Sequence, residues 1–367
     1  MTGLPSPVKT RLLDAAGSMV DRIFLLPPKL AAPFVPPPAM DRNTYEQQLD
    51  FYIDNGYVAR PASFFSLPSA APSFSIIEER PYHDGRYQEI AYKSGYETKS
   101  PLIRDAYHAH VANRTGYLVR WIHDDRPRKT VLCLHGYMLG EPRQARKMFR
   151  VKHLYSAGLD VALFIAPFHW RRRAGGLSKR GFFLQPGNAG MTCECVGQSM
   201  HDLAGACHIL AQLGAPRIGL IGASLGGYNT ALFACLSDMP AFGAMIVPAV
   251  DFSRPLGPNT ARHAFPVDTA LRQKIFSVWG MHSPLNFYPR LSSDRLLVVA
   301  SRGDRLCPFD HVQALCDKWR ISDYHFLSGG HWLVFNGRQR GKAWYEFLFR
   351  MKFLDNPGRK HQNRQSQ

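Results

Sequence analysis

The sequence has no apolar run long enough to cross a membrane and no layout typical of a secretory signal. A membrane-spanning helix needs about 18 or more consecutive apolar residues, and no such stretch is present. The first residues also lack the order of basic start, apolar run and small-residue cleavage site. We therefore expect a cytoplasmic protein.

Acidic residues are scarce relative to basic ones. Asp and Glu number 28 against 45 Lys and Arg, which gives a formal net charge of +17 and a pI near 9.7. Such an excess favours attraction to anionic surfaces or substrates. No zinc-finger spacing, RNP-like strand or heptad-linked basic region accompanies it, so we expect no sequence-specific nucleic-acid binding.

Cysteine is present, but not in a pattern typical of disulfides or metal sites. The count of seven is odd, and several of the cysteines lie inside apolar runs, where a thiol packs as a small hydrophobe. No second Cys or His pair accompanies Cys193 and Cys195 at zinc-site spacing. We expect free thiols in a reducing compartment, and neither a metal nor a cofactor.

The first 127 residues divide into two parts. Residues 1–40 contain an amphipathic stretch at 8–26 and a proline-rich connector at 27–38, which we interpret as an appended helix and an extended segment. The polar face of the helix mixes both charge signs, so docking onto the protein itself is favoured over lying on a membrane. Residues 41–127 predict a helix capped by Asp41 or Asn43, followed by strands near 74–79, 87–92 and 117–122.

From residue 128 to 355, apolar runs alternate with helix-like stretches, which is typical of a mostly parallel sheet covered by helices. Two insertions are expected in this core, at about 168–192 and 251–293, and a basic, disordered tail is expected at 356–367. The predicted strands are 130–134, 160–165, 217–221, 244–247, 295–300 and 323–326, and the predicted helices are 142–157, 196–213, 226–236, 310–319 and 338–353.

A Gly-x-Ser-x-Gly pattern follows the predicted strand at 217–221. Gly222, Ser224 and Gly226 stand where this strand meets a helix, so the chain must turn sharply and hold Ser224 in a strained conformation. Side chains at the flanking glycine positions would collide with the neighbouring strand and helix. Ser224 is the candidate nucleophile.

A serine hydroxyl needs a base to take its proton and a third group to orient that base. Asp304 follows the strand at 295–300, and His331 lies in a glycine-rich loop after the last strand. His331 is favoured over His325, which lies within a strand pattern. Asp304 is favoured over Asp251, which follows an earlier strand and stays open as the alternative acid. The remaining nearby acid, Asp310, is expected to cap a helix.

The strand at 130–134 ends in His135 and Gly136, a turn that can direct a backbone N–H toward a developing oxyanion. We assign the N–H groups of Tyr137 and Leu225 to this role and expect His135 to shape the turn. These four motifs, in this order, resemble the α/β-hydrolase superfamily over about residues 130–354. The resemblance implies an α/β fold with an eight-stranded, mostly parallel sheet, whose first strands precede residue 130, and a lid-like insertion.

The insertion at 168–192 begins with an aromatic and arginine-rich run. Open α/β folds bind ligands at the carboxyl edge of the sheet, where this run is expected to project. Its arginines could hold an anionic group, with Lys179 and Arg180 extending the patch, or could be a solvated loop. The candidate substrate-binding residues are His135, Trp170, Arg171, Arg172, Arg173 and Trp332.

The combined pattern indicates a serine hydrolase that cleaves a small-molecule carboxylic ester or thioester, carboxylesterase-like or lipase-like, with acyl transfer or peptide cleavage less favoured. The substrate could be anionic or lipid-like, and peripheral membrane contact is possible. The alternative is a catalytically silent protein of the same fold that binds membranes or an acidic partner through its basic, amphipathic surfaces.

Overall fold

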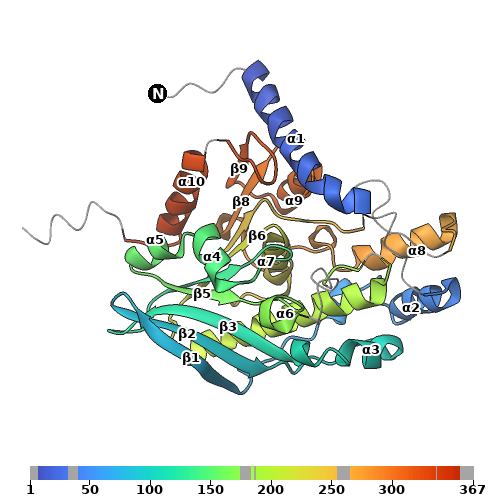
Figure 1. The fold of residues 1–367 in the computed structure, drawn as a ribbon, viewed down its shortest axis with the longest axis horizontal. Helices are drawn as coiled ribbons and strands as arrows, with labels where there is room; N and C mark the ends of the chain where they lie inside the picture. The colour runs from blue at the N-terminus through green and yellow to red at the C-terminus, as the bar shows by residue number, and fades with distance from the viewer. Residues whose placement is uncertain are drawn as a thin grey trace, which may run out of the picture.

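A computed structural model of the chain describes residues 7–31, 40–173, 183–185, 187–253, 265–335 and 337–355. One nine-stranded sheet runs through the molecule in the order β1-β2-β3-β5-β4-β6-β7-β8-β9 (Figure 1). Its strands are β1 Phe74–Tyr82, β2 Gly85–Lys93, β3 Thr115–His123, β4 Thr130–Leu134, β5 Asp160–Phe164, β6 Ile218–Ala223, β7 Gly243–Ile246, β8 Leu296–Ser301 and β9 Tyr324–Leu327.

Helices lie on both faces of this sheet. The α-helices are α1 Pro7–Ala31, α2 Arg42–Asp54, α3 Arg104–His108, α4 Pro142–Met148, α5 Val151–Ser156, α6 Ala189–Gln212, α7 Leu225–Leu236, α8 Thr269–Gly280, α9 Phe309–Trp319 and α10 Gly337–Arg350. Short 3-10 helices are Pro61–Phe64, Pro101–Ile103, Val111–Arg114, Trp170–Arg172, Pro284–Asn286 and Ser293–Arg295. No helix in the described ranges is both long and apolar enough to cross a membrane.

The sheet has an antiparallel and a parallel part. Strands β1, β2 and β3 pair antiparallel, and β3 pairs antiparallel with β5. From β5 through β4, β6, β7 and β8 to β9 every pairing is parallel. The expected mostly parallel α/β sheet is therefore confirmed, but the expected eight strands are nine. The N-terminal part supplies all three antiparallel strands, and β1 extends the edge as a hairpin with β2.

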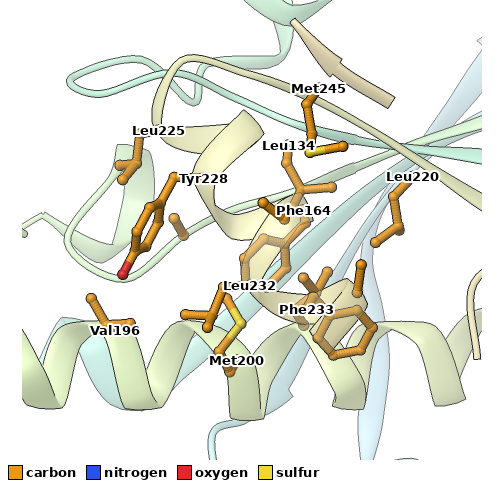
Figure 2. Close-up of a cluster of buried hydrophobic side chains, with 14 of the residues drawn as sticks. Leu134, Phe164, Val196, Met200, Leu220, Leu225, Tyr228, Leu232, Phe233 and Met245 are labelled. Atoms are coloured by element: carbon orange, nitrogen blue, oxygen red, sulfur yellow. The ribbon is translucent and has the colours of Figure 1, made fainter. Parts of the chain in front are cut away.

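Two buried hydrophobic clusters hold the helices against the two faces of the sheet. Residues of α6, α7 and α9 pack with one face of the sheet, and those of α4, α5 and α10 pack with the other. Figure 2 shows Tyr228 and Leu232 of α7 between the strands and α6, where Val196 and Met200 lie. The start of α7 therefore packs between the sheet and a second helix, directly after the turn that carries Ser224.

Several predicted helix boundaries need correction. The single helix expected at 142–157 is two, α4 and α5, because Arg150 adopts a left-handed conformation with φ of 51°. Helix α6 begins at Ala189 rather than 196, since the Asn188 side chain accepts a hydrogen bond from Met191 N. Asp310 lies in the first turn of α9 instead of capping it. The cap expected from Asp41 on α2 is confirmed by its bond from Thr44 N.

Helix α1 is longer than predicted and is not an appendage. It continues through Pro27 and Pro28 to Ala31, although a proline inside a helix removes an N–H donor and crowds the carbonyl of the preceding turn. The expected extended connector is therefore partly helical. Residues 32–39 and 174–182, with Lys179 and Arg180, lie outside the described residues, as do 186, 254–264, 336 and the tail 356–367.

Candidate active site

The turn between β6 and α7 has the strained geometry predicted from its glycines. Ser224 adopts φ 56° and ψ −114°, a conformation that few residues with a side chain occupy. A Cβ at Gly222 would lie 2.0 Å from Gly226 O, and one at Gly226 would lie 1.8 Å from Leu134 O. Both glycines are thus required for backbone contact, and Ser224 is left at the tip of the turn, half-exposed.

Asp304 and His331 meet across the loops that follow β8 and β9. His331 Nδ1 and Asp304 Oδ2 are 2.8 Å apart, and both side chains are largely buried. The other oxygen of Asp304 accepts hydrogen bonds from the backbone N–H groups of Leu306 and Cys307. The carboxylate is therefore held by its own loop while it orients the imidazole, and His331 Nε2 is directed away from it.

Cys307 lies between the serine and the histidine and was not anticipated as a site residue. Its Sγ is 3.8 Å from Ser224 Oγ, and it shares with Asp304 and His331 a group of side-chain atoms within 4.8 Å of one another. Among the hydrogen bonds of the described residues, the Ser224 hydroxyl contacts this sulfur and not His331. Nothing in the sequence pattern marks Cys307, which resembles the other buried cysteines.

The environment of His331 acts on its pKa in opposite directions. Burial lowers the pKa, whereas the Cys307 sulfur and the hydrogen bond with Asp304 raise it. The result is a pKa raised above the ordinary value of 6.5. The site therefore stabilises the protonated imidazole, which is the form that His331 takes after it removes a proton from a serine.

The two alternative side chains have other partners. Asp251 accepts hydrogen bonds from the backbone N and the hydroxyl of Ser253. His325 is half-exposed on β9 and pairs through Nε2 with Asp323 Oδ1 at 3.0 Å. Within the described hydrogen bonds, Asp304 is the acid that contacts the imidazole of His331.

The turn after β4 faces the elbow. A Cβ added at Gly136 would lie 3.6 Å from Ser224 Cβ, so the backbone of this turn passes next to the serine. Tyr137 follows directly in the turn. Leu225 is the first residue of α7, where backbone N–H groups have no partner within the helix. The two predicted donors therefore come from two segments next to Ser224.

Two buried histidines accept hydrogen bonds from backbone N–H groups in this turn and in the segment after β5. His135 Nε2 accepts a hydrogen bond from Ala166 N at 3.1 Å, and His169 Nε2 accepts one from Met138 N at 3.1 Å. Burial lowers the pKa of His135 to about 4 and that of His169 well below 6.5, so both are neutral near pH 7. Both nitrogens of His135 contact backbone atoms and its side chain is buried, so the expectation that it binds substrate is wrong, whereas its expected role in shaping the turn agrees with these contacts.

The arginine run is mostly engaged with the protein's own acids. Arg172 is fully buried, with its guanidinium 2.6 Å from Asp202, so the expectation that it binds substrate is wrong. A periodicity argument could not foresee this, because a three-residue run gives no facing direction. Its neighbours bind acids too: Arg171 contacts Glu89 at 2.7 Å and stacks on Trp170, and Arg173 contacts Glu141 at 3.2 Å.

Trp332 and Asp21 complete the surroundings of His331. Trp332 is 52% exposed, with its ring 5.4 Å from that of His331. Asp21 of α1 is fully buried and accepts hydrogen bonds from the backbone N of both residues. The sequence could not identify Asp21, which reads as one charged position on an amphipathic helix.

Comparison with known proteins gives relatives without an assigned role and solved structures of esterases. No family model matches the chain. Two uncharacterized proteins of Mycobacterium tuberculosis, from strains CDC 1551 / Oshkosh and ATCC 25618 / H37Rv, are each 28% identical over 360 residues, which cover 94% of this chain and 84% of theirs.

Among solved structures, an acetyl xylan esterase from Paenibacillus sp. R4 has a TM-score of 0.54 and 13% identity, over 83% of this chain and 95% of its own. Acetyl xylan esterase 1 from Thermoanaerobacterium sp. JW/SL YS485 has a TM-score of 0.55 and 14% identity, over 82% of this chain and 93% of its own. With the sheet order and the elbow described above, these likenesses show that the chain has the α/β-hydrolase fold.

Proposed function

We propose that this protein is a serine hydrolase that cleaves carboxylic esters or thioesters through an acyl-enzyme. The observation that carries the proposal is the hydrogen bond between Asp304 and His331 beside a strained Ser224. A carboxylate bound to the Nδ1 side of an imidazole leaves Nε2 as the basic atom, which is what activation of a serine hydroxyl requires. Two solved neighbours of this fold are acetyl xylan esterases, which supports an ester as substrate.

In the first half of the reaction, Ser224 Oγ forms a bond to the acyl carbon while its proton passes to His331 Nε2. The carbonyl oxygen becomes an oxyanion, which accepts hydrogen bonds from the N–H groups of Tyr137 and Leu225. When the intermediate collapses, the bond to the leaving alcohol or thiol breaks, and His331 returns the proton to it. Water then attacks the acyl-enzyme by the same route and releases the acid.

The first step requires the serine hydroxyl to turn from Cys307 toward His331. Catalytic hydrogen bonds are often long or misaligned before substrate binds and shorten in the complex, so this geometry is compatible with the role. The Cys307 thiol is a second candidate nucleophile, because its Sγ lies 3.8 Å from Ser224 Oγ. We assign the attack to Ser224 because it has the strained backbone next to the turn of Tyr137, whereas burial raises the pKa of the Cys307 thiol.

Labelling with a fluorophosphonate probe tests this assignment. Wild type, Ser224→Ala, Cys307→Ala and Ser237→Ala are compared, the last being a matched control at the far end of α7. We expect Ser224→Ala alone to abolish labelling and to lower hydrolysis of short nitrophenyl esters by about 10⁴-fold or more. Labelling lost in Cys307→Ala and kept in Ser224→Ala would make the thiol the nucleophile. A folded wild type that neither labels nor hydrolyses would favour the binding role below.

A second candidate role is peripheral binding to an anionic lipid surface, through α1. Leu12, Met19 and Ile23 are 66%, 65% and 58% exposed, and their spacing places them on one side of the helix. Arg11 and Arg22 are also exposed and can attract anionic headgroups. Membrane-surface helices combine such an apolar stripe with flanking basic residues. The chain's net charge of +17 favours the same partner.

A further inference from the structure

The polar side of α1 contacts the two loops that hold Asp304 and His331. Asp21 Oδ2 accepts a hydrogen bond from Arg305 N at 3.0 Å, directly after the acid, and both its oxygens lie within 2.9 Å of His331 N. Trp332 N donates to the same carboxylate at 3.2 Å. One fully buried side chain thus bridges the loop after β8 and the loop after β9.

Two further side chains of the helix extend this contact. Ser18 Oγ donates to Gly303 O at 2.7 Å, on the residue before the acid, and Asp14 Oδ1 accepts from Gly329 N at 3.0 Å. The spacing 14, 18 and 21 places these three side chains on one face of the helix. The face that docks is therefore polar, which is the reverse of how an amphipathic helix usually packs.

Glycines permit the helix backbone itself to touch the loops. A Cβ at Gly17 would lie 2.0 Å from Gly330 N, and one at Gly330 would lie 2.4 Å from Gly17 O. A Cβ at Gly303 would lie 2.3 Å from Asp14 O. The glycines before the acid and before the histidine are thus needed for contact with α1, in addition to the loop-to-loop bond from Gly303 N to Gly329 O.

We propose that Asp21 is a positioning residue that holds His331 in register with Asp304. Its carboxylate fixes the backbone of the histidine loop to the backbone of the acid loop, while Asp304 fixes the imidazole. Charge-assisted hydrogen bonds from backbone N–H groups are stronger than neutral ones, and these lie away from water. An amide in this position would keep one acceptor oxygen, but its NH2 group would point donors at the N–H groups on its other side. The proposal rests on the proposed function, because it assigns His331 a catalytic role.

Asp21→Asn is the direct test, read by steady-state kinetics on a short nitrophenyl ester. We expect kcat to fall by about 10- to 100-fold, as a displacement near 1 Å can cause, with KM changed by less than about 3-fold. Asp14→Ala, which loses the bond at Gly329 only, is a second variant that tests the contact if Asp21→Asn does not fold. It should lower kcat by a few-fold, and an unchanged kcat in a folded Asp21→Asn protein would overturn the proposal.

Glu194→Gln is the matched control. Glu194 is also a fully buried carboxylate with backbone and side-chain donors, from Lys99 N, Ser100 N, Tyr52 and Tyr96, but it lies on α6. It should lower the melting temperature and leave kcat unchanged below the transition. If kcat falls as much in this variant as in Asp21→Asn, loss of stability explains both.

Two readouts do not depend on hydrolysis. The downfield proton resonance of the His331 to Asp304 hydrogen bond should broaden or vanish in Asp21→Asn and persist in Glu194→Gln. Hydrogen exchange at the amides of Arg305, His331 and Trp332 should accelerate in Asp21→Asn only. If wild type fails to react with fluorophosphonate while these signals behave as stated, the proposed function fails and the positioning contact stands. Unaltered signals in Asp21→Asn refute the contact itself.

Discussion

The pKa of His331 sets the pH range in which Ser224 can be activated. Only the neutral imidazole accepts a proton, and burial is outweighed by Cys307 and Asp304, so the pKa lies above 6.5. We expect kcat/KM to rise with pH through that raised pKa. In Asp304→Asn the imidazolium loses its carboxylate, so the rise should move to lower pH while the plateau falls by about 10³- to 10⁴-fold. Rates measured from about pH 5 to 11 check this, since the pKa of His331 is raised to about 11.

His325→Gln is the control for that shift, because His325 pairs with Asp323 on β9 and contacts neither Ser224 nor Asp304 among the described hydrogen bonds. Its pH profile should match wild type. A profile of wild type that is flat across the range, or one that Asp304→Asn leaves in place, would contradict the assignment of His331 as the base.

Gly226 offers a second residue-scale prediction, on stability. A Cβ there would lie 1.8 Å from Leu134 O, a backbone atom that cannot turn aside. We expect Gly226→Ala to lower the free energy of unfolding by about 1–3 kcal/mol or more, as overpacking does. Gly341→Ala on α10 is the matched control, since its Cβ would approach nothing nearer than 3.7 Å. It should raise the free energy of unfolding by about 0.5–1 kcal/mol. Urea denaturation measures the free energy of unfolding of both variants. Equal changes in the two would contradict the interpretation that Gly226 is required for close backbone contact.

At the scale of elements, the short helix Trp170–Arg172 is fixed to α6 by a buried ion pair. Arg172 contacts Asp202 at 2.6 Å and also donates to the backbone oxygens of Ile165 and Asn113. Removing one partner of a buried pair leaves the other charge unpaired, so Arg172→Ala should lower the free energy of unfolding by about 3–5 kcal/mol. Arg171→Ala, whose side chain is partly exposed, should cost about 1 kcal/mol or less. Thermal denaturation that ranks these variants the other way round would contradict the buried pair.

At the scale of the whole molecule, the parallel half of the sheet was predictable, and so was the docking of α1 onto the protein, but the face by which α1 docks was not. Each strand from β4 to β9 is an apolar run of a few residues, and Ser224, Asp304 and His331 follow three of them, so their convergence follows from parallel topology. The break at Arg150 has no glycine to signal it. The docked face of α1 depends on loops that lie between 284 and 315 residues away in the sequence, and hydrophobic periodicity favours the opposite face.

That reversed docking gives the last prediction. Because Gly17, Ser18 and Asp21 are buried, Leu12, Met19 and Ile23 face away from the body and remain exposed. We expect the protein to bind vesicles of anionic lipid, more weakly at high salt because exposed charges are screened. Replacing Leu12, Met19 and Ile23 together with Gln should abolish co-sedimentation, whereas Ser224→Ala should bind as wild type does. The triple variant should keep its esterase activity on soluble substrate, since the opposite face of α1 contacts the catalytic loops. A wild type that ignores vesicles but elutes as a dimer, with the triple variant a monomer, would instead assign the stripe to a second copy of the chain.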